Sequence, residues 1–201
     1  MMTSDKTTWM KCLAFSFFLL LISLFAFACN PILLTPKTPI PPCASPSETG
    51  VLTSNLGHIF GLGSGNLLAQ AITLSAPTTA FSITVDLIGY GSIPNTGQVW
   101  SAIYQDNGAN APGSLVGASN PQNVVTGLNA LSLPNLALPA SGSTIYWLTL
   151  QLSNNSNFAP ENPASNIVMI APHSWGAFPS TFPASPTSFS ACIEIYVSTC
   201  P

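Results

Sequence analysis

Alternation of apolar and polar residues with a period of two is the feature that most constrains this sequence. Residues 81–87 read FSITVDL, so that Phe, Ile, Val and Leu alternate with Ser, Thr and Asp. The same alternation runs through residues 146–152 and 189–197. A period of two is typical of a strand that buries one face. We therefore expect a strand in each of these three segments.

Between these segments the chain carries shorter apolar runs, separated by turns that are rich in Gly, Pro and Asn. The runs occupy residues 68–74, 99–104, 114–118, 123–125, 131–136 and 166–171. No stretch carries the 3.6-residue period of a helix of three turns. Many short strands with such punctuation predict an all-β protein, an antiparallel sandwich or barrel.

The N-terminus has the pattern of an export signal. Lys6 and Lys11 precede residues 13–28, which carry no charge and end in Ala-Phe-Ala. This run is slightly short for a membrane-spanning helix, which needs about 20 residues. A basic start, an apolar run and a small-x-small ending together predict a signal segment at residues 1–28.

The residue after the predicted cleavage site is Cys29, and its position resembles the lipobox of bacterial lipoproteins. Three alternatives stay open: lipidation of Cys29, simple secretion, and an uncleaved N-terminal anchor. Without lipid, the mature chain has an even set of cysteines that can form two bridges, namely Cys29, Cys43, Cys192 and Cys200. Parity therefore favours secretion without lipid.

Export to an oxidising compartment makes a disulfide plausible. A bridge from Cys43 to Cys192 or Cys200 would tie the N-terminal segment to the last strand. The alternative for Cys192 is a buried small apolar residue. Residues 29–50 hold many prolines without periodicity, which predicts a Pro-rich linker. Residues 51–201 then form one β domain, large enough to build its own core.

Charge is nearly absent: of 201 residues, three are Lys or Arg and six are Asp or Glu. From residue 38 onward there is no Lys or Arg at all. Nucleic-acid binding needs cationic side chains to neutralise phosphates, so we expect no such partner. Membrane contact is expected only through an N-terminal lipid or an uncleaved signal. Prolines would have to protect the sheet edges in place of the missing charges.

Several segments together resemble a family of secreted bacterial β-sandwich domains, described as choice-of-anchor domains. The segments are LAQAIT at 68–73, the strand 81–87, IYQDN at 103–107, APGSLV at 111–116 and STIYWL at 143–148. The resemblance implies a jelly-roll-like sandwich at or outside the cell surface, with no established activity. Anchors in that family are commonly C-terminal, whereas this chain ends in Cys-Pro, so we expect an N-terminal anchor if there is one. The predicted fold is an antiparallel jelly-roll-like β-sandwich after a signal segment and a Pro-rich linker.

Asp106 and Asn107 precede a glycine between two predicted strands. Asn and Gly tolerate positive φ angles, so we expect both side chains to cap a turn by bonding to nearby backbone. The sharper alternative is a calcium site, because Asp, Asn and carbonyl oxygens are suitable ligands. Such a site would lack the several carboxylates of a strong calcium site.

The sequence has few combinations of residues that could form a catalytic site. His58 and His173, the only histidines, have no Cys or carboxylate at zinc-ligand spacing. The segment GLGSG at 61–65 does not fit the nucleophile motif G-x-S-x-G. Asp86 and Glu194 are expected on outer strand faces, exposed to solvent, rather than across a cleft as in a glycosidase. We therefore expect no enzyme and no cofactor.

Aromatic residues gather in the Pro-rich loop 172–186, where Trp175, Phe178 and Phe182 lie close to His173. Aromatic faces stack on sugar rings, so this loop is a candidate ligand site. The favoured alternative is a satellite core beneath a long loop.

The segment NNSN at 154–157 would supply Asn154 and Asn155 as amide partners if the fold brings the two loops together. Trp100 and Trp147 lie in predicted strands and are expected to serve packing. These observations favour an exported or surface-anchored, non-enzymatic interaction module whose partner is a neutral glycan or a surface protein. A structural or matrix protein without a small ligand, and a secreted hydrolase, are the alternatives.

Overall fold

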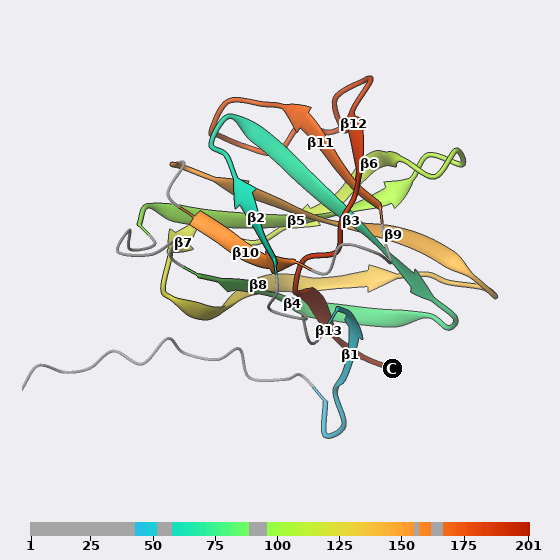
Figure 1. Ribbon diagram of the computed structural model, residues 1–201. Coiled ribbons are helices and arrows are strands. Elements are labelled where there is room, and N and C mark those ends of the chain that lie inside the picture. The colour runs from blue at the N-terminus through green and yellow to red at the C-terminus, as the bar shows by residue number, and fades with distance from the viewer. Residues whose placement is uncertain (1–42, 52–57, 89–95, 155–156, 162–166) are drawn as a thin grey trace, which may run out of the picture. The chain divides into compact units, whose positions relative to one another are not determined.

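The computed structural model describes residues 43–51, 58–88, 96–154, 157–161 and 167–201 (Figure 1). These residues form thirteen strands and no helix, which confirms the predicted all-β class. Within these ranges no helix is long and apolar enough to cross a bilayer. The predicted signal segment, Cys29 and Asn155 lie outside the described residues.

The strands form two antiparallel sheets, here called sheet I and sheet II, and a separate ribbon. Sheet I has the order β1 (Ser47–Gly50), β13 (Ile195–Cys200), β4 (Thr78–Leu87), β8 (Gly127–Leu138). Sheet II has the order β12 (Thr187–Ser190), β11 (Ile167–Pro172), β3 (Asn66–Leu74), β9 (Thr144–Leu152), β5 (Gln98–Asp106), β6 (Pro112–Ala118), and β7 (Gln122–Asn123) also pairs with β5. The ribbon pairs β2 (His58–Leu62) with β10 (Asn157–Glu161).

The order of the strands is that of a jelly roll. In chain order the eight principal strands are β1, β3, β4, β5, β6, β8, β9 and β13. Sheet I takes the first, eighth, third and sixth of them, and sheet II the second, seventh, fourth and fifth. This interleaving is the double Greek key of a jelly roll. The predicted jelly-roll-like sandwich is therefore confirmed.

The inner faces of the two sheets bury one large apolar cluster, and this burial explains the period of two. Ile83, Val85 and Leu87 of β4 face it, while the polar residues between them point outward. On the opposing sheet the inward set of β9 is Tyr146, Leu148, Leu150 and Leu152. Burial of apolar area at this interface is the main favourable term in folding.

One predicted strand is wrong as a single element. The alternating segment 189–197 splits into the end of β12 in sheet II and the start of β13 in sheet I. Gln70 of β3 stabilises the crossing between them, since its Nε2 donates to Ile193 O (3.1 Å) and its Oε1 accepts from Ile193 N (2.8 Å). Within the crossing Ala191, Cys192 and Ile193 are all buried, whereas Phe189 of β12 is 43% exposed, so the alternation does not persist where the chain changes sheets.

Edge strand β8 of sheet I is interrupted by Pro134. The register between β4 and β8 shifts at this point, and Asn135 adopts a φ of 51°. A proline and a bulge both discourage pairing with another chain, which agrees with the expectation that prolines protect the edges.

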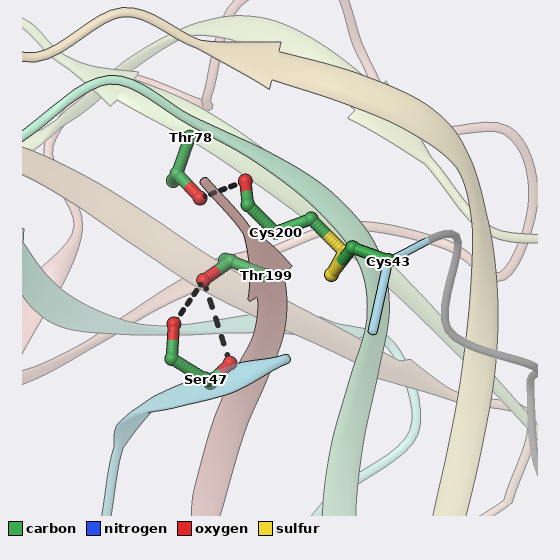
Figure 2. Close-up of a disulfide and its surroundings, with 5 residues drawn as sticks. All are labelled: Cys43, Ser47, Thr78, Thr199 and Cys200. Atoms are coloured by element: carbon green, nitrogen blue, oxygen red, sulfur yellow. Dashed lines mark hydrogen bonds between the residues drawn. A yellow bond between two sulfur atoms is a disulfide. The ribbon is translucent and has the colours of Figure 1, made fainter. Parts of the chain in front are cut away.

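The N-terminal edge of the domain is fixed by a disulfide between Cys43 and Cys200 (Figure 2). Close to it, Ser47 Oγ and Thr199 Oγ1 lie 3.0 Å apart, and Thr78 Oγ1 donates to Cys200 O at 2.6 Å. Of the two partners expected for Cys43, the structure therefore selects the C-terminal one. Cys192 is buried, 3% exposed, and lies outside this bridge.

Strand β1 belongs to the segment that the sequence assigned to the linker. Residues Ser47–Gly50 pair with β13, so the β domain begins before the expected boundary at residue 51. The strand was not predictable from periodicity, because it is an edge strand in which Thr49 is the one partly buried residue. Gly50 is required where the strand ends: its φ is +139°, and a Cβ there would lie 2.5 Å from Ile195 O.

Candidate functional site

The outer face of sheet II carries a second apolar cluster, separate from the main core. Trp147 of β9 and Tyr104 of β5, which are register partners, form its centre. Phe178 and Phe182, from the long loop after β11, pack onto them. The aromatic loop therefore lies against the sheet instead of projecting from it.

Three hydrogen bonds fix residues 179–182 of this loop to sheet II. Phe182 N donates to Gly113 O (2.8 Å), and Leu115 N donates to Ser180 O (2.9 Å). Tyr104 contributes its hydroxyl, which donates to Pro179 O at 2.8 Å. Burial raises the pKa of the Tyr104 hydroxyl well above its usual range, so this donor stays protonated at any physiological pH.

The rings form a continuous series that runs from a buried end to a partly exposed one. Tyr104 contacts Phe182 and Phe178, with ring centroids 5.4 and 6.4 Å apart. Phe178 meets Trp100 edge to face at 5.3 Å, and Trp100 meets Trp175 at 6.0 Å in a tilted arrangement. Edge-to-face and tilted geometries of this kind are favourable for aromatic pairs.

Exposure divides the predicted aromatic cluster in two. Phe178 and Phe182 are 8% and 5% exposed and fit the satellite-core interpretation. Trp175 is only partly buried, and so is Trp100, which the sequence had assigned to packing. Trp147 is buried, as expected for a packing residue. The partly exposed pair Trp100–Trp175 is the part of the cluster that a ligand can reach.

Gln151 and His173 tie the near half of the loop to the sheet. Gln151 Nε2 donates to Ser174 O (2.8 Å), and Gly176 N lies 3.5 Å from Gln151 Oε1. His173 N donates to Gly65 O (2.9 Å), while its Nε2 lies 3.2 Å from Ala177 O. Gln151 is thus an amide side chain beside Trp100, its register partner on β5. Nothing in the sequence singles out Gln151, because it occupies an ordinary strand position.

Asn154 has a different environment from the one expected of it. It lies beyond the end of β9, and its Nδ2 donates to Thr96 Oγ1 at 2.8 Å. Gly97 packs against it so closely that a Cβ there would lie 2.7 Å from Asn154 Nδ2. Asn154 therefore supports the turn before β5.

Asp106 and Asn107 cap their turn. Asp106 Oδ2 accepts from Gly108 N and Oδ1 from the Trp147 indole, at 2.8 and 3.0 Å. Asn107 Oδ1 accepts from Ala109 N at 2.8 Å. In the described part of the chain no group of three or more His, Cys, Asp or Glu side chains could hold a metal ion. The geometry accounts for both side chains as structural, and the calcium site stays a prediction.

On the outer face of sheet I, the structure brings together carboxylates that are distant in sequence. Val85 pairs with Ile195, and Asp86 N donates to Glu194 O (3.1 Å), so Asp86 and Glu194 lie opposite each other where β13 begins. Both side chains are partly buried, whereas the sequence predicted that they would be exposed to solvent. Burial raises the pKa of Asp86. The pKa of Tyr196 is also raised, mainly by burial and further by the negative charges of Glu48 and Glu194.

Two shallow hollows, of about 390 and 210 Å³, flank Thr78 and Pro201 near the disulfide. Their walls consist of prolines, small apolar residues and hydroxyl side chains, without an aromatic ring. They have no ring on which a sugar could stack, whereas Trp100 and Trp175 are partly exposed and lie beside the buried Gln151. We therefore take the aromatic pair as the candidate site.

Comparison with known proteins adds no family to this description. No protein-family model matches the sequence, and no curated protein is significantly similar to it.

Proposed function

We propose that this protein is an exported, surface-attached, non-enzymatic module that binds a neutral glycan on the outer face of sheet II. The observation that carries the proposal is the partly exposed pair Trp100–Trp175 beside Gln151. Sugar rings present apolar C–H faces that pack on aromatic rings, and their hydroxyls pair with amides and backbone groups.

The absence of Lys and Arg from the β domain supports a neutral ligand. Because the chain has no Lys or Arg from residue 38 onward, no side-chain cation in the domain can pair with an acidic sugar or a phosphate. Recognition through rings, amides and hydroxyls is expected to depend little on ionic strength, since it involves no exposed charge pairs.

Attachment through a lipid on Cys29 is part of the proposal. Parity had favoured a disulfide role for Cys29, but Cys43 and Cys200 pair with each other, and Cys192 is buried. This pairing supports lipidation, because neither Cys43 nor Cys200 is available to form a disulfide with Cys29.

The binding proposal is tested with immobilised hexasaccharides of glucose (β-1,4 and α-1,4), xylose, mannose and N-acetylglucosamine. We expect the wild type to bind at least one of them equally in low and high salt, and Trp175→Ala to abolish binding. Phe189→Ala is the matched control, because Phe189 is an aromatic residue that is 43% exposed elsewhere on sheet II. An absence of binding by the wild type, or equal binding by Trp175→Ala, would refute the proposal.

Attachment is tested by metabolic labelling with a fatty-acid analogue in a bacterial host. We expect label in the wild type and none in Cys29→Ala, which should be released from the membrane fraction. A wild type without label rules out the lipid anchor and leaves the binding proposal untouched.

A further inference from the structure

Thr149 carries an unpaired buried hydroxyl on the outer face of sheet II. It lies between Trp147 and Gln151 on β9 and is 0% exposed. Its Oγ1 is the one fully buried side-chain polar atom without a hydrogen-bond partner among the described residues.

Structural stability alone does not explain a threonine at this position. A buried hydroxyl without a partner is unfavourable, and valine has nearly the same shape and the same preference for strands. Buried polar groups that lack partners are rare in native proteins and require an explanation. Such breaks of local rules are expected at functional sites.

The neighbours of Thr149 place it at the candidate site. Its register partners are Ala69 on β3 and Ala102 on β5, two small side chains in the same outer cluster as Phe178. Trp100 is two residues from Ala102 on the same face of β5, and Gln151 is two residues from Thr149 on β9. The hydroxyl, the amide and the indole therefore share one side of the sheet.

The segment that bonds to Gln151, residues 174–177, lies between two anchored points. His173 N is bonded to Gly65 O before it, and Phe178 packs in the outer cluster after it. Between these two points the segment bonds to Gln151, and the distance from Gly176 N to Gln151 Oε1 is long, at 3.5 Å. The residues are Ser, Trp, Gly and Ala, so small side chains flank the single large ring.

We propose that Thr149 and Gln151 form the floor of the glycan site, with Gln151 directly beneath residues 174–177. When a neutral sugar packs on Trp100 and Trp175, the Gln151 amide exchanges its bonds with Ser174 O and Gly176 N for bonds with sugar hydroxyls, and the neighbouring Thr149 Oγ1 gains a sugar hydroxyl as its partner. The sugar supplies the partner that the Thr149 hydroxyl lacks, with no charged group involved. This inference rests on the proposed glycan-binding function.

The test uses Thr149→Val and Thr149→Ser in the full-length protein, with the same hexasaccharides as probes. Thr149→Val keeps the shape and removes the unpaired hydroxyl, so we expect a melting temperature equal to or above that of the wild type. We also expect its affinity for the bound hexasaccharide to fall about tenfold, the effect of roughly one hydrogen bond. Thr149→Ser keeps the hydroxyl and should bind within about threefold of the wild type.

The possible outcomes separate this inference from the proposed function. If the wild type binds and Trp175→Ala does not, while Thr149→Val binds as tightly as the wild type, the floor assignment is wrong and the glycan surface stands. If Thr149→Val and Thr149→Ser lose affinity equally, shape rather than the hydroxyl matters, and the assignment is also wrong. If the wild type binds none of the probes, both proposals fail together.

Discussion

Loss of the Cys43–Cys200 disulfide should destabilise the domain strongly. The two cysteines are 157 residues apart, so the bond closes a covalent loop that contains nearly all of the β domain. In the chain-entropy model, closing a loop of this length removes about 17 cal/mol/K from the unfolded chain, or about 5 kcal/mol at 25 °C. Because a domain is typically stable by only about 5–15 kcal/mol, this contribution is a large share of the total.

The structure also indicates where the damage would begin. Without the bond, β1 keeps its pairing with β13 and the contact between Ser47 and Thr199, but it is a four-residue edge strand. We expect β1 to detach first and the remaining sandwich to melt at a lower temperature. A loss of about 5 kcal/mol corresponds to a decrease of roughly 10–20 °C in a domain of this size.

The assay is urea unfolding followed by circular dichroism, with the wild type compared with Cys43→Ala/Cys200→Ala. Addition of a reducing agent should shift the wild type toward the double variant and leave the double variant unchanged. Cys192→Ala is the matched control: it removes a buried thiol outside the bridge and should retain the response to reduction. A free thiol detected at Cys43 or Cys200 in the exported protein, or a stability loss below about 1 kcal/mol, would refute the reasoning.

Four further predictions concern other residues of the domain. Gly50→Ala should cost about 1–3 kcal/mol in urea unfolding, because its new Cβ would collide with the backbone at Ile195 O. Asp106→Ala should cost about 1–3 kcal/mol, because it leaves the buried Trp147 indole without its acceptor. If the turn is structural, EDTA should not alter the melting temperature of the wild type, whereas a decrease that calcium reverses would establish the calcium site. Asp86→Asn should stabilise the protein at pH 7. Burial raises the pKa of Asp86 in the folded protein above the unfolded value of 3.8, so the stability that the carboxyl contributes is fully present below pH 3.8. That stability is lost as the pH rises through the folded-state pKa, and a neutral amide avoids this loss. Urea titrations at pH 4 and pH 7 check this, and an unchanged pH dependence in the variant would contradict it.

The sequence predicted the strands that bury one full face and missed those that do not. Residues 81–87 and 146–152 alternate because each side of the strand has a different environment, and both are strands in the structure. Strand β1 lies at an edge with almost no buried side, so it left no periodic signal. The break within 189–197 was invisible for another reason, since Ala191, Ile193 and Ile195 are buried although the chain changes sheets along this segment.

The candidate site was predictable only in part, because it depends on register. The cluster of aromatic residues in the loop after β11 is evident in the sequence, but which rings are covered is not. Trp100 becomes partly exposed beside Trp175, and Gln151 becomes its neighbour, through the pairing of β5 with β9. The opposition of Asp86 and Glu194 has the same origin in the pairing of β4 with β13. Single-strand patterns contain no information about which strands pair.

The near absence of charge has consequences both for stability and for recognition. Without Lys or Arg, the domain depends largely on neutral polar cross-links: Gln70 to Ile193, Tyr104 to Pro179 and the hydroxyls near the disulfide. Hydrogen bonds between neutral groups are screened little by salt, unlike surface ion pairs. We expect a protein held together in this way to keep its fold across a wide range of ionic strength. The same groups are then the ones available for binding, which is why an unpaired hydroxyl such as that of Thr149 acquires a significance that it would not have in a charge-rich domain.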